Sequence, residues 1–141
     1  TELNPISCEI TYGLERIAMY LQGKTDIFEL VWSEGGGNGR LLYGDLFKER
    51  EIQHSTHHFD QADPALLQRL FGLYEKEAGR LLEKSLYFPA YDYVLKTSHS
   101  FNLLDASGSL STSERQGLIA RVRGLAKGCA ELYLKRVQAK P

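Results

Sequence analysis

The sequence predicts an α+β protein in which one strand–helix unit is followed by a mostly α-helical bundle. Two observations support this fold class. Residues 8–12 alternate between apolar and polar side chains, and from residue 14 the apolar side chains recur with helical spacing. Beyond residue 44, long segments keep the helical period between start and stop signals. We therefore expect a strand–helix unit over residues 1–23 and a helical domain over residues 24–141.

The strand–helix unit changes its period at Gly13. Gly23 stands where a left-handed helix C-cap belongs. Strand alternation and helical spacing predict one apolar face on each element, formed by Cys8, Ile10 and Tyr12 on the strand and by Leu14, Ile17, Ala18 and Leu21 on the helix.

Glu9, Thr11 and Arg16 are the polar groups that this unit brings near one end of the strand. Glu9 and Thr11 lie on the face opposite the apolar one, and Arg16 leaves the core-facing stripe of the helix. An arginine there can clamp a phosphate or stack on a flat base, and a carboxylate beside it can hold an ammonium group or a metal. The alternative is a surface arginine that pairs with Glu9 or Glu15. Spacing alone leaves both interpretations open.

Residues 24–44 are predicted to form short elements. Thr25 is expected to cap a short helix over Asp26–Val31 that Trp32 closes, and residues 40–43 are expected to be briefly extended. The glycine-rich stretch 33–39 lacks the Gly-Lys-Ser/Thr ending of a phosphate-binding loop and opens no helix. We expect a surface loop there.

Four helices are predicted for the remainder of the chain, over residues 45–57, 64–84, 89–104 and from 111 almost to the C-terminus. Gly72 and Gly79 lie on one of them, where absent side chains would permit close approach of another backbone. The start signals are a cap at Asp45, the pair Asp63-Pro64, Pro89, and a capping box of Ser111 with Glu114.

His54, His57 and His58 invite a metal hypothesis, because His54 and His58 are four residues apart on one predicted helix. No cysteine is near them, and a third ligand would have to be Asp60 or a distant residue. Solvated or partner-facing histidines are the preferred interpretation, so we predict no metal site.

The last helix is rich in basic residues, which could meet RNA phosphates or an acidic partner, although a solvated basic face is the more frequent explanation. Over the whole chain, 17 basic residues face 18 acidic ones, so bulk charge gives no argument for nucleic-acid binding. No run is long and apolar enough for a membrane span. Cys8 and Cys129 are expected to be buried, reduced thiols, as in a cytoplasmic protein.

Residues 10–20, Ile-Thr-Tyr-Gly-Leu-Glu-Arg-Ile-Ala-Met-Tyr, resemble motif 3 of the class II aminoacyl-tRNA synthetases, in the form carried by the alpha subunit of bacterial glycyl-tRNA synthetase. Gly13 alone remains of the several glycines of the general motif, and Ser107 stands where the family tends to have an arginine. Further segments resemble the same subunit in the same order: Tyr43 to Phe47, Tyr74 to Ala78, His99 to Ala106, and Ser113 to Gln116.

The resemblance implies that residues 1–23 are the end of a class II catalytic domain and that the chain is the C-terminal half of the subunit. It implies a glycine–tRNA ligase that activates glycine with ATP and Mg²⁺ and transfers it to tRNA(Gly). Arg16 matches the motif 3 arginine, which packs on the adenine or reaches the γ-phosphate of ATP. By the same resemblance, Gly13 is expected to belong to the ATP-binding site together with Arg16. Glu9 and Thr11 are the candidates for binding glycine.

The partners implied are the beta subunit, a second alpha subunit in a homodimer, and tRNA(Gly). Because the motif 1 and motif 2 segments are not seen, we expect the chain alone to be inactive. One alternative is a non-catalytic helical interaction module for subunit assembly. A second alternative is a zinc-binding helical protein built on the histidines.

Overall fold

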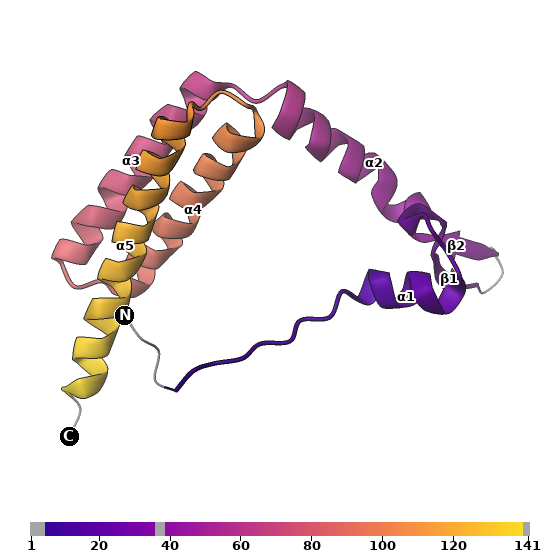
Figure 1. Ribbon diagram of the computed structural model, residues 1–141, viewed down its shortest axis with the longest axis horizontal. Helices are drawn as coiled ribbons and strands as arrows, with labels where there is room; N and C mark the ends of the chain where they lie inside the picture. Colours follow the sequence, from indigo (N-terminus) through magenta and orange to yellow (C-terminus); the bar gives the residue numbers. More distant parts are fainter. Residues whose placement is uncertain (1–4, 36–38, 140–141) are drawn as a thin grey trace. The chain divides into compact units, whose positions relative to one another are not determined.

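The computed structural model describes residues 5–35 and 39–139 (Figure 1). These residues form mostly helices and one two-stranded antiparallel sheet, which confirms the predicted α+β class. The chain folds as two compact units, Thr1–His54 and Ser55–Pro141. Within the described ranges, no helix is long and apolar enough to span a membrane.

Helix α1 (Leu14–Gln22) opens the first unit and ends as predicted. Gly23 has φ 61°, in the left-handed region, and the N–H groups of Gly23 and Lys24 donate to backbone carbonyls of the last turn. None of the helix residues is fully buried, and Leu21 on the apolar stripe is 75% exposed. The expected apolar stripe therefore forms, but most of it lies exposed at the surface of the described residues, with Ala18 only partly covered.

The strand predicted over residues 8–12 is wrong, because these residues have no regular secondary structure. A strand needs a neighbour that pairs its backbone N–H and C=O groups, and alternating side chains do not supply one. Among the described residues, the sheet consists of β1 and β2 alone. Cys8, expected to be buried, is exposed, whereas Cys129 is buried; both are free thiols.

A 3-10 helix, Ile27–Glu29, replaces the helix predicted over Asp26–Val31. Asp26, not Thr25, caps it, since its carboxylate accepts the N–H of Phe28 at 2.9 Å. The amide side chain of Gln22 bonds both the N–H and the C=O of Val31, at 2.8 and 3.1 Å. These two bonds take the Val31 backbone groups that a continuing helix would need, so the chain turns into a strand.

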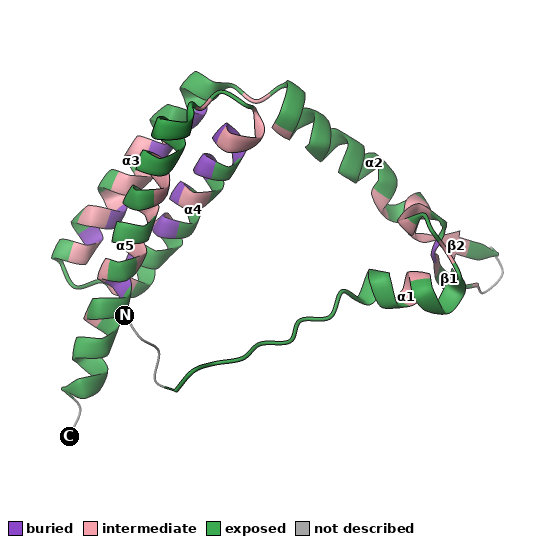
Figure 2. Ribbon diagram, in the orientation of Figure 1, coloured by how far each residue is buried: buried purple, intermediate pink, exposed green. Residues whose placement is uncertain are grey.

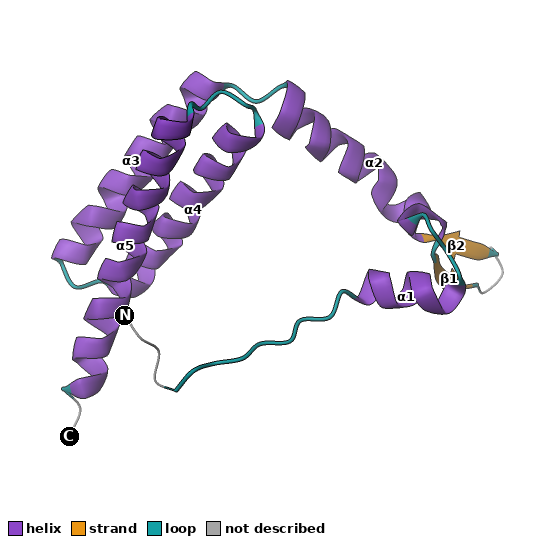
Figure 3. Ribbon diagram, in the orientation of Figure 1, coloured by secondary structure: helices purple, strands orange, loops and turns teal. Residues whose placement is uncertain are grey.

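Strands β1 (Val31–Glu34) and β2 (Arg40–Leu42) form an antiparallel hairpin, and β2 confirms the predicted extended segment (Figure 3). Val31 lies opposite Leu42 and Ser33 opposite Leu41, so Trp32 is an extra residue in a β-bulge. Trp32 was predicted to close a helix. It is instead a strand residue that is 56% exposed.

Helix α2 (Tyr43–Ser55) begins ahead of the predicted cap, Asp45. The Asp45 carboxylate accepts the N–H of Leu42 at 2.9 Å, and the N–H of Tyr43 donates to the carbonyl of Leu30 at 2.8 Å. Because a side chain of the first helical turn satisfies the Leu42 N–H and a carbonyl outside the helix satisfies the Tyr43 N–H, α2 can start directly at the end of β2. It continues into a π-helical turn, Thr56–Asp60.

The second unit is a bundle of three helices, α3 (Pro64–Glu83), α4 (Tyr87–Ala106) and α5 (Thr112–Gln138) (Figure 1). The predicted caps at Asp63 and Ser111 are confirmed, the latter with its full capping box. Helix α4 starts earlier than predicted. Pro89 falls in its first turn, where a missing N–H costs no intrahelical bond.

The bundle core is made of buried apolar side chains from all three helices (Figure 2). One cluster centres on Ala78, Leu81, Ala90, Val94 and Cys129, and another on Leu67, Leu103 and Leu104. The buried hydroxyls of Thr97 and Ser100 donate to backbone carbonyls four residues earlier. No polar side-chain atom buried within the described residues lacks a hydrogen bond.

Close helix packing occurs at Gly128, not at Gly72 and Gly79 as predicted. A methyl group added at Gly72 or Gly79 would meet no atom within 4 Å outside its own turn of helix. A methyl group at Gly128 on α5 would lie 3.1 Å from Cδ1 of Leu82 on α3.

Candidate functional site

The four residues predicted to form the site, Glu9, Thr11, Gly13 and Arg16, are all exposed. Thr11 donates its hydroxyl hydrogen to the Glu9 carboxylate at 2.5 Å, so these two side chains are brought together. Gly13 and Arg16 also meet, because the aliphatic stem of Arg16 lies 3.7 Å from where a Cβ of Gly13 would stand. No interaction described in the structure joins the two pairs.

Arg16 forms no ion pair with a described residue, which argues against the alternative of a surface arginine paired with Glu9 or Glu15. Gly13 is the N-cap of α1, and its carbonyl accepts the N–H of Ile17 at 3.2 Å. The guanidinium thus stands at the first turn of a helix, where it is available to an anion or a flat ring.

The surface around this stretch is unusually apolar. Ile10 and Tyr12 are 73% exposed, and Leu14 is 75% exposed. Several large apolar side chains left exposed in one short stretch are typical of a surface that packs against further protein.

A second group of side chains gathers at the hairpin, around a cavity of about 540 Å³. The ring of Trp32 is held by the aromatic side chains of Tyr43, at a centroid distance of 6.0 Å, and of Phe47, at 5.3 Å and edge-on. The residues that line the cavity come from α1, the turn that follows it and both strands: Gln22, Lys24, Val31, Trp32, Ser33, Glu34 and Arg40.

The two cations of this hairpin cavity are paired with carboxylates at the surface. Lys24 lies 3.4 Å from Glu29, and Arg40 lies 2.7 Å from Glu34. Sequence reasoning missed this group because it assigned Trp32 to the end of a helix and residues 33–39 to a loop. The signal that was available is the single tryptophan of the chain, with a lysine and an arginine within eight residues on either side.

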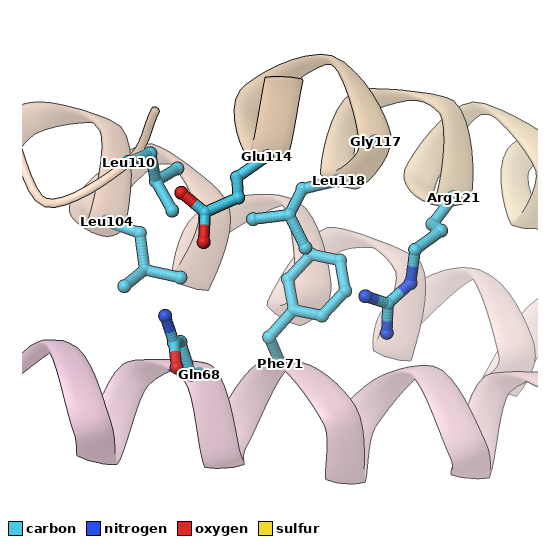
Figure 4. Close-up of a pocket in the computed structure, with 8 residues that line it drawn as sticks. All are labelled: Gln68, Phe71, Leu104, Leu110, Glu114, Gly117, Leu118 and Arg121. Carbon is cyan, nitrogen blue, oxygen red and sulfur yellow. The ribbon is translucent and has the colours of Figure 1, made fainter. Parts of the chain in front are cut away.

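A third cavity, of about 370 Å³, lies among the bundle helices, with Glu114 and Arg121 at opposite ends of an apolar floor (Figure 4). Arg121 bonds the Glu75 carboxylate with Nε at 2.7 Å and also with a terminal nitrogen, and its guanidinium lies 4.7 Å above the ring of Phe71. The hydrogen bond to Glu75 raises the pKa of Arg121. Hydrogen bonds from Ser111 lower the pKa of Glu114.

Both charged groups of the bundle cavity are therefore committed to structure. Glu114 completes the capping box of α5, and Arg121 joins α5 to α3. Phe71 is 2% exposed and Leu104 is fully buried, so the floor belongs to the core. This arrangement stabilises the bundle and presents no free acid or base.

The three predicted histidine positions lie at the end of α2 and in the π-helical turn, with the His57 and His58 rings 5.5 Å apart. The described part of the chain contains no group of three or more His, Cys, Asp or Glu residues that could hold a metal ion. The zinc alternative therefore has no ligand set in this part of the chain.

The basic face of α5 is partly used within the fold. Arg115 pairs with Asp105 at 2.9 Å, Arg121 with Glu75, and Lys127 with Glu131 at 3.6 Å. Lys140 lies outside the described residues. These pairs favour the structural and solvated interpretation over an RNA-binding face.

Comparison with known families gives a match that covers nearly the whole chain. The family model described as glycyl-tRNA synthetase alpha subunit matches residues 1–138.

Proposed function

Because the chain belongs to the glycyl-tRNA synthetase alpha subunit family, we propose that it takes part in ATP-dependent activation of glycine and in transfer of glycine to tRNA(Gly). The observation that carries this proposal is the family match over residues 1–138, which includes the motif 3-like stretch and its exposed arginine.

Arg16 is proposed as the residue of this chain that acts on ATP. Activation moves negative charge onto the α-phosphate, and a fixed guanidinium nearby stabilises that charge. Arg16 suits this role because it is exposed, its stem rests against Gly13, and no described carboxylate neutralises it. Gly13 has φ −80°, which any residue can adopt, so we propose that its lack of a side chain serves close approach of the nucleotide.

Glu9 and Thr11 are proposed to recognise glycine. The Thr11 hydroxyl already bonds the Glu9 carboxylate, so it fixes the direction in which the carboxylate can receive an ammonium group. Glycine offers no side chain to grip, so selection depends on excluding larger amino acids and on holding the ammonium. The carboxylate–hydroxyl pair would supply the second of these functions.

ATP and Mg²⁺ are the cofactors that the family implies. The described residues fit ATP in part, with Arg16 as one cation and Gly13 as a position without a side chain. They include no cluster of three or more metal-binding side chains. Mg²⁺ usually binds through substrate phosphates, water and one or two carboxylates, so it would need no such cluster. A single arginine is too little for a triphosphate, so the 141-residue chain alone is expected to be inactive.

The proposed partners are the beta subunit, a second alpha subunit and tRNA(Gly). The exposed apolar surface around Ile10, Tyr12 and Leu14 suits packing against further protein of the catalytic domain. The other candidate, a non-catalytic helical interaction module, is favoured by one observation: the charged groups of the bundle cavity are committed to structure.

Glycine-dependent exchange of pyrophosphate into ATP tests the proposal. In an enzyme that joins this chain to the motif 1 and motif 2 segments and the beta subunit, Arg16→Ala should cost about 2–4 kcal/mol of transition-state stabilisation. Arg123→Ala is the matched control, because Arg123 is an exposed arginine on α5. Equal exchange by the Arg16 variant and its parent would remove Arg16 from the site. Exchange by the 141-residue chain alone would contradict its expected inactivity.

A further inference from the structure

The cavity at the β1–β2 hairpin combines an exposed aromatic ring with two cations. We propose that it binds an unpaired nucleotide, with the base stacked on Trp32 and the phosphate held by Arg40 and Lys24. This inference rests on the proposed function in one respect, since both adenine nucleotides and a single-stranded RNA end are substrates of that reaction. The cavity volume of about 540 Å³ is in the range of small-molecule sites, roughly 300–1,000 Å³.

Trp32 has the placement of a stacking platform. It is the bulged residue of β1, and a bulge re-aims a side chain that regular pairing would direct elsewhere. The ring contacts Phe47 edge-on, at an interplanar angle of 69°, and also contacts Tyr43, so two aromatic neighbours restrict its movement. An indole that is 56% exposed yet held in place gives a base a flat surface at low entropic cost.

The position of the hairpin is also fixed. Two hydrogen bonds from the Gln22 side chain attach the end of α1 to the first residue of β1. Lys24, just beyond the cap of α1, therefore stands at a set place relative to Trp32. The cavity and the helix that carries Arg16 belong to one compact unit.

The cations are available because their present partners hold them weakly. Side chains of Lys24 and Arg40 are 36% and 59% exposed, and exposed ion pairs contribute about 1 kcal/mol or less. A phosphate offers Arg40 a bidentate partner with more charge than one carboxylate. Glu34 also lines the cavity, so its negative charge opposes an anionic ligand. Removing that charge should therefore tighten binding, an effect that damage to the fold would not produce.

Intrinsic fluorescence provides the direct assay, because Trp32 is the one tryptophan of the chain. The full chain is titrated with AMP and, separately, with a short single-stranded RNA ending in adenosine. Saturable quenching of tryptophan emission is expected. Tighter binding of AMP would assign the site to a free nucleotide, and tighter binding of the RNA would assign it to an RNA strand. Emission unchanged by both probes would overturn the proposal.

Charge variants test the geometry with a labelled RNA or AMP and fluorescence anisotropy. Arg40→Gln should weaken binding roughly 10-fold or more, the scale for losing a hydrogen bond to a charged group. Lys48→Gln removes the same charge from the same unit, but Lys48 lies 5.5 Å over the ring of Phe28 and does not line the cavity. Little change is expected for Lys48→Gln, and tighter binding is expected for Glu34→Gln. Equal losses of affinity for Arg40→Gln and Lys48→Gln, or no gain of affinity for Glu34→Gln, would refute the site.

Trp32→Ala should weaken binding roughly 5-fold or more, the scale for losing one stacked base. Unchanged helical circular dichroism would show that the variant still folds. A failure of this test is distinguishable from a failure of the proposed function. Quenching by AMP or RNA needs no pyrophosphate exchange, and a variant of Arg16 that has lost exchange should still show it.

Discussion

Replacing Gly72 and Gly79 by alanine tests whether another backbone packs closely against α3 at these two positions, as their sequence spacing suggested. A new methyl group at either position meets nothing within 4 Å outside its own turn of helix, so no strain opposes it. Alanine in a helix interior is favoured over glycine by about 0.5–1 kcal/mol, since glycine loses more backbone freedom on folding. The double variant should therefore raise the free energy of unfolding by about 1–2 kcal/mol.

The measurement is urea unfolding of the full chain, followed by far-UV circular dichroism, together with the midpoint of thermal unfolding. For a domain of roughly 60–100 residues, each kcal/mol corresponds to about 4–8 °C. Gly128→Ala is the matched control, because its methyl group would lie 3.1 Å from Cδ1 of Leu82. Displacing Leu82 costs about 0.5–1.5 kcal/mol, which offsets the helical gain. A loss of stability in the Gly72 and Gly79 variants would refute the open space around these positions. It would show that another element packs closely there, since overpacking costs about 1–3 kcal/mol.

Two further predictions concern the cap of α5 and the cysteines. Ser111→Ala should destabilise the bundle by about 1 kcal/mol in the same unfolding assay, because Ser111 caps the helix. Hydrogen bonds from Ser111 lower the pKa of Glu114 in the folded state, so the stabilisation by the ionised Glu114 carboxylate is present above the unfolded pKa and is lost as the pH falls through the folded pKa. Urea titrations at neutral and acidic pH should therefore show a smaller effect of Ser111→Ala in acid. An effect that is independent of pH would contradict this cause. Cys8 is exposed, whereas Cys129 is buried and its burial raises the pKa of its thiol. A thiol reagent should therefore modify Cys8 rapidly and Cys129 only with denaturant. Mass spectrometry that finds Cys129 modified first would contradict its place in the bundle core.

Much of the helical fold could be predicted from the sequence, because its signals act over a few residues. The Asp63 cap bonds the N–H groups of Ala65 and Leu66, and the Ser111–Glu114 box closes within one turn. The left-handed cap at Gly23 is equally local. Such contacts form wherever the sequence places the residues, so caps and helical periods are predicted well.

The candidate site was predicted only in part. Spacing and resemblance selected Glu9, Thr11, Gly13 and Arg16, and the structure brings them together as two pairs. The hairpin cavity was missed. It depends on the bulge at Trp32 and on the Gln22 amide, which reaches nine residues along the chain to Val31.

The sequence by itself determined the family segments, the helical stripes and the residues that begin and end the helices. Only the tertiary structure decided that residues 8–12 form no strand, that Trp32 is the bulged residue beside a cavity, and that Gly128 rather than Gly79 lies against another helix. The physical reason is the separation along the chain between the residues that interact. A cap or an apolar stripe is fixed by neighbours within a turn or two, whereas a strand partner, a cavity wall or a helix contact is supplied by residues that the local pattern does not specify.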